Sequence, residues 1–360
     1  AEGHGLPAMD DDASGANQEV AQPPLYYAAA ALLSAPFPDD DLMTLFWHNP
    51  NFGHQAPGTV PDNKNMLIHT AQERWPWRGA VPAIRVARLT SLLFGCLTVA
   101  AAWGLGYETF RDRRAALVTA MVVAVHPQFV FISGVVSNDS AAAALSTVAL
   151  WLTARALRRG PSLRRVLLLG IGVGLASLTK SSVVLLGPLV ALGLLVAVWA
   201  WRPEGVSRRF VLAVGRIWLL YGVAALSVGG WWYARNWVRY GDPLGFTSHI
   251  DTPWGRSAPV SLLALLPEMP LLLRSFWAAY GWGHVMWPDW VYGVLWGASL
   301  VGLGYAAYRI GGRFFAALRV TREEGEILRC AQNDKRGGRN DKIRRRVILS
   351  EVEGSRGFFA

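Results

Sequence analysis

The stretch VLLLGIGVGLASLTKSSVVLLGPLVALGLLVAVWAW, residues 166–201, decides the fold. It contains a single charged side chain, Lys180, and it has Arg164 and Arg165 just before it and Arg202 just after it. A membrane span needs roughly 20 helical residues, so this run is long enough for two spans. Loops rich in Arg and Lys face the cytoplasm, which places both ends of the run on that side. The run is therefore predicted to fold back on itself, with Lys180 at its outer turn.

Similar apolar segments fill much of the chain. Hydrophobic residues make up 52% of the sequence and charged residues only 17%, well under the roughly 25% of a typical soluble domain. The expected fold is an all-α polytopic membrane protein of about seven transmembrane helices, with an outer cap of loops and interfacial helices. The expected spans are 84–106, 115–136, 140–157, 166–180, 181–201, 210–233 and 290–310.

The net charge of +10 has to be interpreted together with these spans. In a soluble protein such a charge would suggest nucleic-acid binding. Here the arginines cluster in short loops at 111–114, 155–165 and 202–209, where the positive-inside rule explains them. Membrane lipids are expected partners of the chain, and nucleic acid is not. The first loop is predicted to lie outside the cytoplasm and the C-terminus inside.

Three regions follow from this topology. Residues 1–83 form the first extracytoplasmic loop, with juxtamembrane helices and an apolar patch at 24–33. Residues 84–310 form the transmembrane bundle. Residues 311–360 are a basic cytoplasmic tail, which is predicted to be disordered and resembles the translation of dispersed bacterial repeat DNA.

The bundle region includes a second outer loop, residues 234–289, which is dense in aromatic side chains. Such rings prefer the headgroup level of a membrane. The stretch 260–283 is apolar enough for an eighth span or a re-entrant segment. Its prolines, Glu268 and Arg274 favour a segment that lies on the membrane surface instead.

The sequence gives little support for a metal or a disulfide. Cys96 and Cys330 are the two cysteines, and the histidines lack ligand spacing. No cofactor is predicted with certainty, and a divalent metal stays an unsupported option. His126–Pro127, inside an expected span, is predicted only to bend it. Because the chain opens at Ala1 in a polar loop, an upstream segment is expected.

The first candidate site is NQEVAQPPLYY, residues 17–27. The two prolines extend the backbone before an apolar helix, and they can hold Glu19 and Gln22 near the membrane surface. Tyr26 and Tyr27 would anchor that helix at the headgroups. The alternative is an ordinary entry from loop to helix with incidental polar residues.

Two further candidates lie at outer turns. A carboxylate at the depth of Asp139, beside Asn138, is costly unless it is paired or hydrated, and so it indicates function. The alternative is that Asn138 or Asp139 caps the following helix. Lys180 suits a phosphate or carboxylate partner; the alternative is that its amine simply reaches the interface.

The last candidates are Arg235 and Arg239, which follow a span on the outer side, against the positive-inside trend. An anionic ligand would explain them. The alternative is a structural ion pair with Asp242 or Asp251.

Four stretches together carry a family resemblance. They are EVAQPPLYY, HPQFVFISGVVSNDS, GLASLTKSSVVLLGP and WWYARNWVRYGDPLG, in this order between residues 17 and 245. With them the chain resembles GT-C membrane glycosyltransferases close to the dolichyl-phosphate-mannose protein mannosyltransferases. Such enzymes carry an acidic pair after their first span, which here would precede Ala1. Glu19 matches a further functional carboxylate of the family.

The resemblance implies transfer of a sugar from a polyprenyl-phosphate donor to a glycan, lipid or protein acceptor, outside a bacterial cytoplasmic membrane. Polyprenyl phosphate is a weak base and a good leaving group, so no general acid is needed. A carboxylate that deprotonates the acceptor hydroxyl and cations that hold the departing phosphate would help the reaction. Glu19 and Asp139 are the candidate catalytic residues, and Lys180, Arg235 and Arg239 the candidate phosphate ligands. Gln22, Tyr26, Tyr27 and Asn138 are candidate substrate-binding residues. A non-catalytic fragment of such an enzyme is one alternative. A transporter or lipid flippase is the other, although no internal repeat is visible.

Overall fold

The computed structural model describes residues 6, 22–50, 67–201, 207–245, 261–280 and 285–308. Within these ranges the chain is helical, and its β-structure is limited to two isolated bridges, His48–Leu67 and Tyr280–Val285. The prediction of an all-α polytopic membrane protein is confirmed. The chain divides into two units, one up to Trp287 and one from Pro288.

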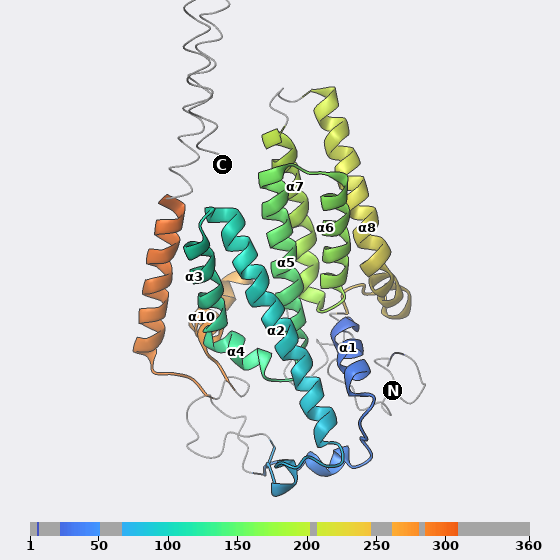
Figure 1. Ribbon diagram of the computed structural model, residues 1–360, viewed down its shortest axis with the longest axis vertical. Coiled ribbons are helices and arrows are strands. Elements are labelled where there is room, and N and C mark those ends of the chain that lie inside the picture. The colour runs from blue at the N-terminus through green and yellow to red at the C-terminus, as the bar shows by residue number, and fades with distance from the viewer. Residues whose placement is uncertain are drawn as a thin grey trace, which may run out of the picture. The chain divides into compact units, whose positions relative to one another are not determined.

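The first unit is built mainly from long helices that lie side by side (Figure 1). Its α-helices are α1 (Leu25–Ser34), α2 (Val81–Phe110), α3 (Arg113–Ala124), α4 (Pro127–Ser133), α5 (Asn138–Arg159), α6 (Leu163–Ser177), α7 (Leu186–Trp201), α8 (Arg208–Tyr240) and α10 (Met269–Trp277). Its short 3-10 helices are η2 (Leu42–Leu45), η3 (Ala71–Glu73), η4 (Ser181–Leu185) and η5 (Leu262–Glu268). The second unit contains the helix Asp289–Tyr308.

Five described helices are long and apolar enough to cross a membrane: α2, α5, η4 with α7, α8 and Asp289–Tyr308. The pair α3 and α4, bent by 65°, makes a sixth if it counts as one span. The expected span 166–180 corresponds to α6, which has only 15 residues. At about 1.5 Å per residue it covers about 22 Å, less than the roughly 30 Å of hydrocarbon in a bilayer. Among the described residues, five or six helices are therefore long enough to be full spans, compared with the seven or so that were predicted.

The break between α3 and α4 lies at His126–Pro127, where a bend was predicted. Pro127 has no backbone N–H and cannot continue α3. His126 becomes the N-cap of α4, and its Nδ1 accepts a hydrogen bond from the Phe129 amide at 3.3 Å.

Helices α6 and α8 approach each other closely because glycines line their contact. A Cβ on Gly170 would lie 2.6 Å from the Tyr221 carbonyl oxygen, and one on Gly174 would lie 2.7 Å from the Ala225 carbonyl oxygen. Small residues at such spacing allow helix backbones to meet in a membrane protein. The buried side chains of α5, α6, α7 and α8 form the core beside this contact, among them Val166, Leu169, Val190, Leu194 and Ile217.

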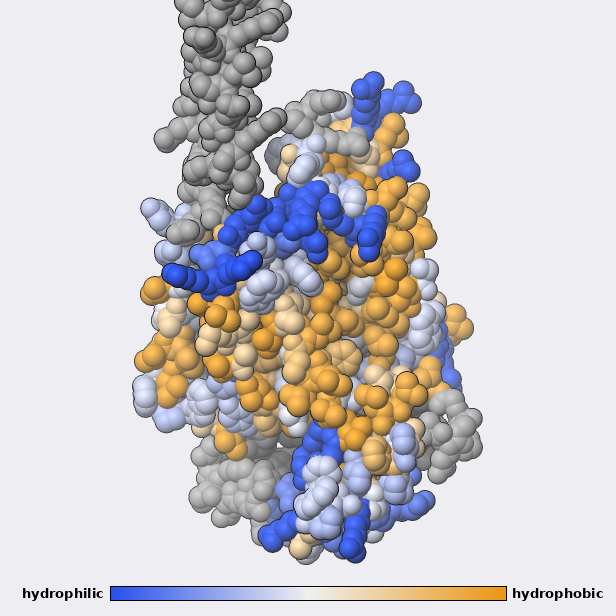
Figure 2. All heavy atoms as spheres, viewed as in Figure 1, coloured by the Kyte–Doolittle hydropathy of each residue, from blue (hydrophilic) through white to orange (hydrophobic). Residues whose placement is uncertain are grey.

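The two ends of the first unit differ in charge. One end, here called the arginine-rich end, carries Arg111, Arg113, Arg114, Arg155, Arg158, Arg159, Arg164, Arg165, Arg208 and Arg209. Figure 2 shows a hydrophilic band at this end, a hydrophobic belt below it and hydrophilic residues again at the opposite end. That pattern is expected of a protein whose middle faces lipid.

A buried carboxylate ties α2 to α5 at the arginine-rich end. Glu108 forms an ion pair with Arg158 at 2.5 Å and lies 3.8 Å and 3.6 Å from Arg155 and Arg159. The negative charge of Glu108 is thus shared among three arginines of α5. Arg111 ends α2 in the left-handed conformation, with φ of 59°.

The second outer loop differs from the prediction at its start. Helix α8 continues to Tyr240 and ends at Gly241, whose φ is 69°. Arg235 and Arg239 are therefore helical residues and not loop residues. In the region 260–283, α10 has nine residues, too few to cross a bilayer. No described helix of that region is long enough for an eighth span.

Candidate functional site

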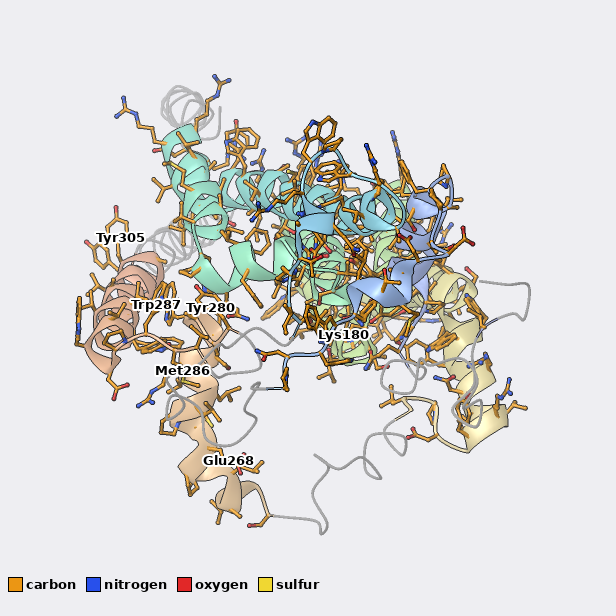
Figure 3. The ribbon with its side chains drawn as sticks, turned by 90° about the horizontal axis from the view of Figure 1, so that it is seen from below. Lys180, Glu268, Tyr280, Met286, Trp287 and Tyr305 are labelled. Carbon is orange, nitrogen blue, oxygen red and sulfur yellow. The ribbon has the colours of Figure 1, made fainter. Side chains whose placement is uncertain are left out.

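Several predicted site residues meet at the end of the first unit opposite the arginine-rich end. We call this group the polar junction and define it by Gln22, Tyr26, Ser91, Ser137, Asp139, Lys180 and Ser181. It joins the start of α1, the side of α2, the turn before α5 and the turn between α6 and η4. Viewed from this end, Lys180 lies in the middle of the bundle (Figure 3).

Tyr26 is the buried centre of the junction. Its side chain is fully buried, and its hydroxyl lies 2.6 Å from Ser91 Oγ. The same hydroxyl accepts a hydrogen bond from the Ser137 amide at 3.0 Å. Burial raises the pKa of Tyr26 above its ordinary value, so the phenol is neutral at physiological pH. Tyr26 therefore acts as a neutral bridge between α1, α2 and α5.

Asp139 and Lys180 form an ion pair, with Lys180 Nζ 2.5 Å from Asp139 Oδ1. The helix cap is Ser137, whose Oγ accepts from the Asp139 amide at 3.2 Å. The alternative that Asn138 or Asp139 provides the cap is therefore wrong, because Ser137 already occupies that position. The Lys180 and Asp139 side chains are 32% and 42% exposed, so the pair remains open to a ligand.

Asn138 lies in the first turn of α5 and is buried, yet its Nδ2 has no hydrogen-bond partner among the described residues. A buried donor without a partner costs about 1–3 kcal/mol. Beside Asp139, this amide is a donor that a bound ligand can satisfy.

The start of α1 is held against the turn after α6. The Leu25 amide donates to the Leu178 carbonyl oxygen at 2.9 Å, and the Gln22 Oε1 accepts from the Ser181 amide at 3.3 Å. The helix begins at Leu25 after Pro24, as the sequence predicts. Gln22 thus supports the backbone that positions Lys180. Tyr27 packs edge-on against Tyr26, with ring centroids 5.4 Å apart.

Helix α8 reaches the same turn through Tyr233, whose hydroxyl donates to the Ser177 carbonyl oxygen at 2.7 Å. Arg235 Nη1 donates to Asn236 Oδ1 at 3.1 Å, and its guanidinium lies 4.8 Å from the centroid of the Trp232 ring. Arg239 is in the last turn of α8, where a cation is favoured by the helix dipole. Neither arginine is among the side chains that meet Tyr26.

Three features predicted from the sequence are not among the residues that the structure describes. Glu19, the tail 311–360 and Asp251 lie outside the described residues. Among the residues described, no group of three or more His, Cys, Asp or Glu side chains is placed to hold a metal ion.

Sequence reasoning missed Ser91, Ser137 as the cap, and Tyr233. Ser91 lies inside an apolar span with no local motif, so no signal pointed to it. Tyr233 belongs to the stretch WWYARNWVRYGDPLG, in which only the two arginines were predicted to have a role.

A cavity of about 370 Å³ lies apart from these contacts, where the chain enters α2. Its lining residues come from η2, η3 and the segment before α2: Asp41, Thr44, Leu45, Ala71, Gln72, Arg74, Trp75, Pro76, Arg78 and Val81.

Comparison with known proteins adds a family to this geometry. Residues 81–228 match the family described as dolichyl-phosphate-mannose-protein mannosyltransferase. No curated protein and no solved structure matches the chain significantly. The matched range runs from the first residue of α2 into α8 and includes Ser91, Asp139 and Lys180. Over residues 81–228, the chain is therefore similar to this GT-C family of membrane mannosyltransferases.

Proposed function

We propose that the chain transfers a sugar from a polyprenyl-phosphate-linked donor to an acceptor, and that the reaction takes place at the polar junction. The Asp139–Lys180 ion pair carries this proposal. It sets a carboxylate and an ammonium group side by side at one end of a membrane bundle, inside the range that matches the mannosyltransferase family. These are the two kinds of group that the reaction requires.

The proposed reaction is a single displacement at the anomeric carbon of the sugar. The acceptor hydroxyl oxygen forms a bond to that carbon while the bond to the phosphate oxygen breaks, and the configuration inverts. The hydroxyl proton goes to a carboxylate, Asp139 or Glu19. The polyprenyl phosphate leaves with the electron pair of the broken bond, and Lys180 stabilises its charge.

The other candidates have supporting roles in this scheme. The Asn138 Nδ2 can donate to a sugar hydroxyl, and Gln22 and Tyr26 hold the turns that carry Lys180 and Asp139. Tyr27 is proposed to contact substrate beside Tyr26. Arg235 and Arg239 are proposed as further phosphate ligands from the end of α8. A metal is not needed for this scheme.

The orientation is also a proposal. The arginine-rich end is typical of a cytoplasmic face, which puts the polar junction on the outer side of a bacterial cytoplasmic membrane. Donor and acceptor would then meet in the outer leaflet or at its surface.

The test is donor cleavage in membranes that contain the protein, with polyprenyl phosphate release from a labelled donor as the readout. Asp139→Asn should lower release by about 10²-fold or more if Asp139 is the base. Lys180→Ala should weaken donor binding, and Lys180→Arg should restore part of it because the positive charge is kept. Arg113→Ala, which removes an exposed charge at the arginine-rich end, is the matched control.

Unchanged release in both Asp139→Asn and Lys180→Ala would contradict the proposal. Movement of intact donor across the membrane without release of polyprenyl phosphate would support the transporter alternative. A chain that binds donor but never cleaves it would support the non-catalytic alternative.

A further inference from the structure

The cavity before α2 is lined by two arginines and by a single carboxylate, Asp41. Arg74 and Arg78 both line it. Neither belongs to any ion pair among the described residues. Both arginines are exposed, so their guanidinium groups are free to form charge-assisted hydrogen bonds with an anion that enters the cavity.

The acidic groups nearby are already engaged. Asp41 Oδ1 accepts a hydrogen bond from the Ala80 amide at 2.7 Å. Glu73 lies 2.9 Å from His69 Nδ1. Asp41 thus holds the backbone at the start of α2 and still contributes one negative charge, against the two positive charges of Arg74 and Arg78 in the same lining.

An exposed indole stands beside these arginines. Trp75 lines the cavity and is 78% exposed. Trp77 packs edge-on against it, with ring centroids 5.3 Å apart, and Arg85 lies over the Trp77 ring at 5.6 Å. The ring of Trp75 is thus held in place with a large part of its surface uncovered. A flat indole surface of this kind can pack against the C–H face of a sugar ring.

From these observations we infer that the cavity binds a saccharide that carries a phosphate or carboxylate group. The guanidinium groups of Arg74 and Arg78 hold the anionic group, Trp75 packs on the ring, and Gln72 and Thr44 offer polar atoms to the hydroxyls. The volume of about 370 Å³ is in the range of small-molecule sites, about 300–1,000 Å³.

The position of the cavity suggests what this ligand is for. Val81 lines it at the first turn of α2, and Ser91, which contacts Tyr26, lies about 15 Å further along the same helix. An anionic saccharide held here would be near the polar junction without occupying it. Its assignment as part of the acceptor rests on the proposed function, whereas the binding itself does not.

Isothermal titration of the full chain in nanodiscs of zwitterionic lipid tests the inference. The probe is glucose 6-phosphate, with glucose and inorganic phosphate as matched ligands. We expect saturable binding of glucose 6-phosphate that is at least about tenfold weaker in Arg74→Gln or Arg78→Gln, since each removes a charge-assisted contact. Trp75→Ala should weaken binding of glucose 6-phosphate but not of inorganic phosphate.

The controls are Arg113→Gln and Trp199→Ala, which alter an exposed arginine and an exposed tryptophan in other parts of the bundle. Both should bind like the unchanged chain, and thermal unfolding should show that all variants are folded. In a Lys180→Ala chain, Arg74→Gln should still weaken glucose 6-phosphate binding, which separates this result from failure of the transfer reaction.

Absence of saturable binding would overturn the inference, as would binding that ignores Arg74 and Arg78. If inorganic phosphate binds as tightly as glucose 6-phosphate and Trp75→Ala has no effect, the cavity is an anion site that does not recognise the sugar ring. That result would contradict the inference. A third outcome is that glucose 6-phosphate does not bind, whereas the chain binds anionic vesicles in a way that requires Trp75 and Arg78. The cavity would then be a site for lipid headgroups, and the saccharide inference would be wrong.

Discussion

At the scale of single residues, the polar junction depends on one hydroxyl. The Tyr26 oxygen contacts both Ser91 on α2 and the amide of Ser137 before α5. Ser137 in turn caps α5 and donates its hydroxyl to Asp139 Oδ2 at 3.2 Å, while Asp139 Oδ1 pairs with Lys180. A tyrosine that looked like a membrane anchor in the sequence therefore determines where the candidate catalytic carboxylate lies.

We expect Tyr26→Phe to lower the free energy of unfolding by about 1–3 kcal/mol, because it leaves the partly buried Ser137 amide and the buried Ser91 hydroxyl without their partner. Thermal unfolding in detergent measures this loss. Tyr107→Phe is the control, since its hydroxyl makes no hydrogen bond among the described residues. Equal stability of the two variants would show that the Tyr26 bridge contributes nothing.

At the scale of helices, the contact between α6 and α8 sets the height of the Lys180 turn. Gly229 packs against Gly174 and Ser177, and Tyr233 bonds the Ser177 carbonyl oxygen one turn later. Lys180 follows three residues after Ser177. The close helix contact and the ion pair are therefore parts of one arrangement.

Gly229→Ala should destabilise the protein by about 1–3 kcal/mol, since the added Cβ would meet Ser177 Oγ and lie 2.7 Å from the Gly174 carbonyl oxygen. The adjacent Gly230→Ala is the matched control. There the nearest atom of another residue is 3.5 Å away, and removing a helix glycine should be neutral or stabilising by up to about 1 kcal/mol. Unfolding curves that rank the two variants in the opposite order would refute the close-packing argument.

At the scale of the whole molecule, the two ends of the first unit carry different charged groups. The arginine-rich end has one buried carboxylate, Glu108, for three neighbouring arginines. The other end has the polar junction and the cavity with Arg74 and Arg78. The long apolar helices hold these ends apart by the thickness of a membrane.

Cysteine labelling tests the orientation in intact cells. In a chain with Cys96 and Cys330 replaced, Met43→Cys should react with a membrane-impermeant maleimide, because Met43 is 78% exposed in the segment before α2. Arg113→Cys should react only after the cells are permeabilised. Labelling of position 113 from outside would reverse the topology and place the proposed reaction on the cytoplasmic side.

The sequence alone determined the fold class, because long apolar runs between arginine clusters have few solutions other than membrane helices. It also located the turn at Lys180, because a lone charge is costly inside an apolar span. It located the start of α1 near Pro24, because proline restricts the backbone before it. The number of full spans predicted from the sequence was too high, because α6 ends at Ser177 after 15 residues. The hydrogen bonds of the turn that follows determine this end, and the apolar sequence does not mark it. It also placed Arg235 and Arg239 in a loop, because aromatic and basic residues at the end of α8 are compatible with either state.

Only the tertiary structure decided which residues meet. Asp139 and Lys180 are 41 positions apart, and Tyr26 is 111 positions from Ser137. No local pattern encodes such pairs, because they depend on how α1, α2, α5 and α6 pack and on how far each helix extends. The cavity with Arg74 and Arg78 is of the same kind. Its residues are ordinary in the sequence, and they become a candidate site because the fold brings η2 and η3 against the first turn of α2.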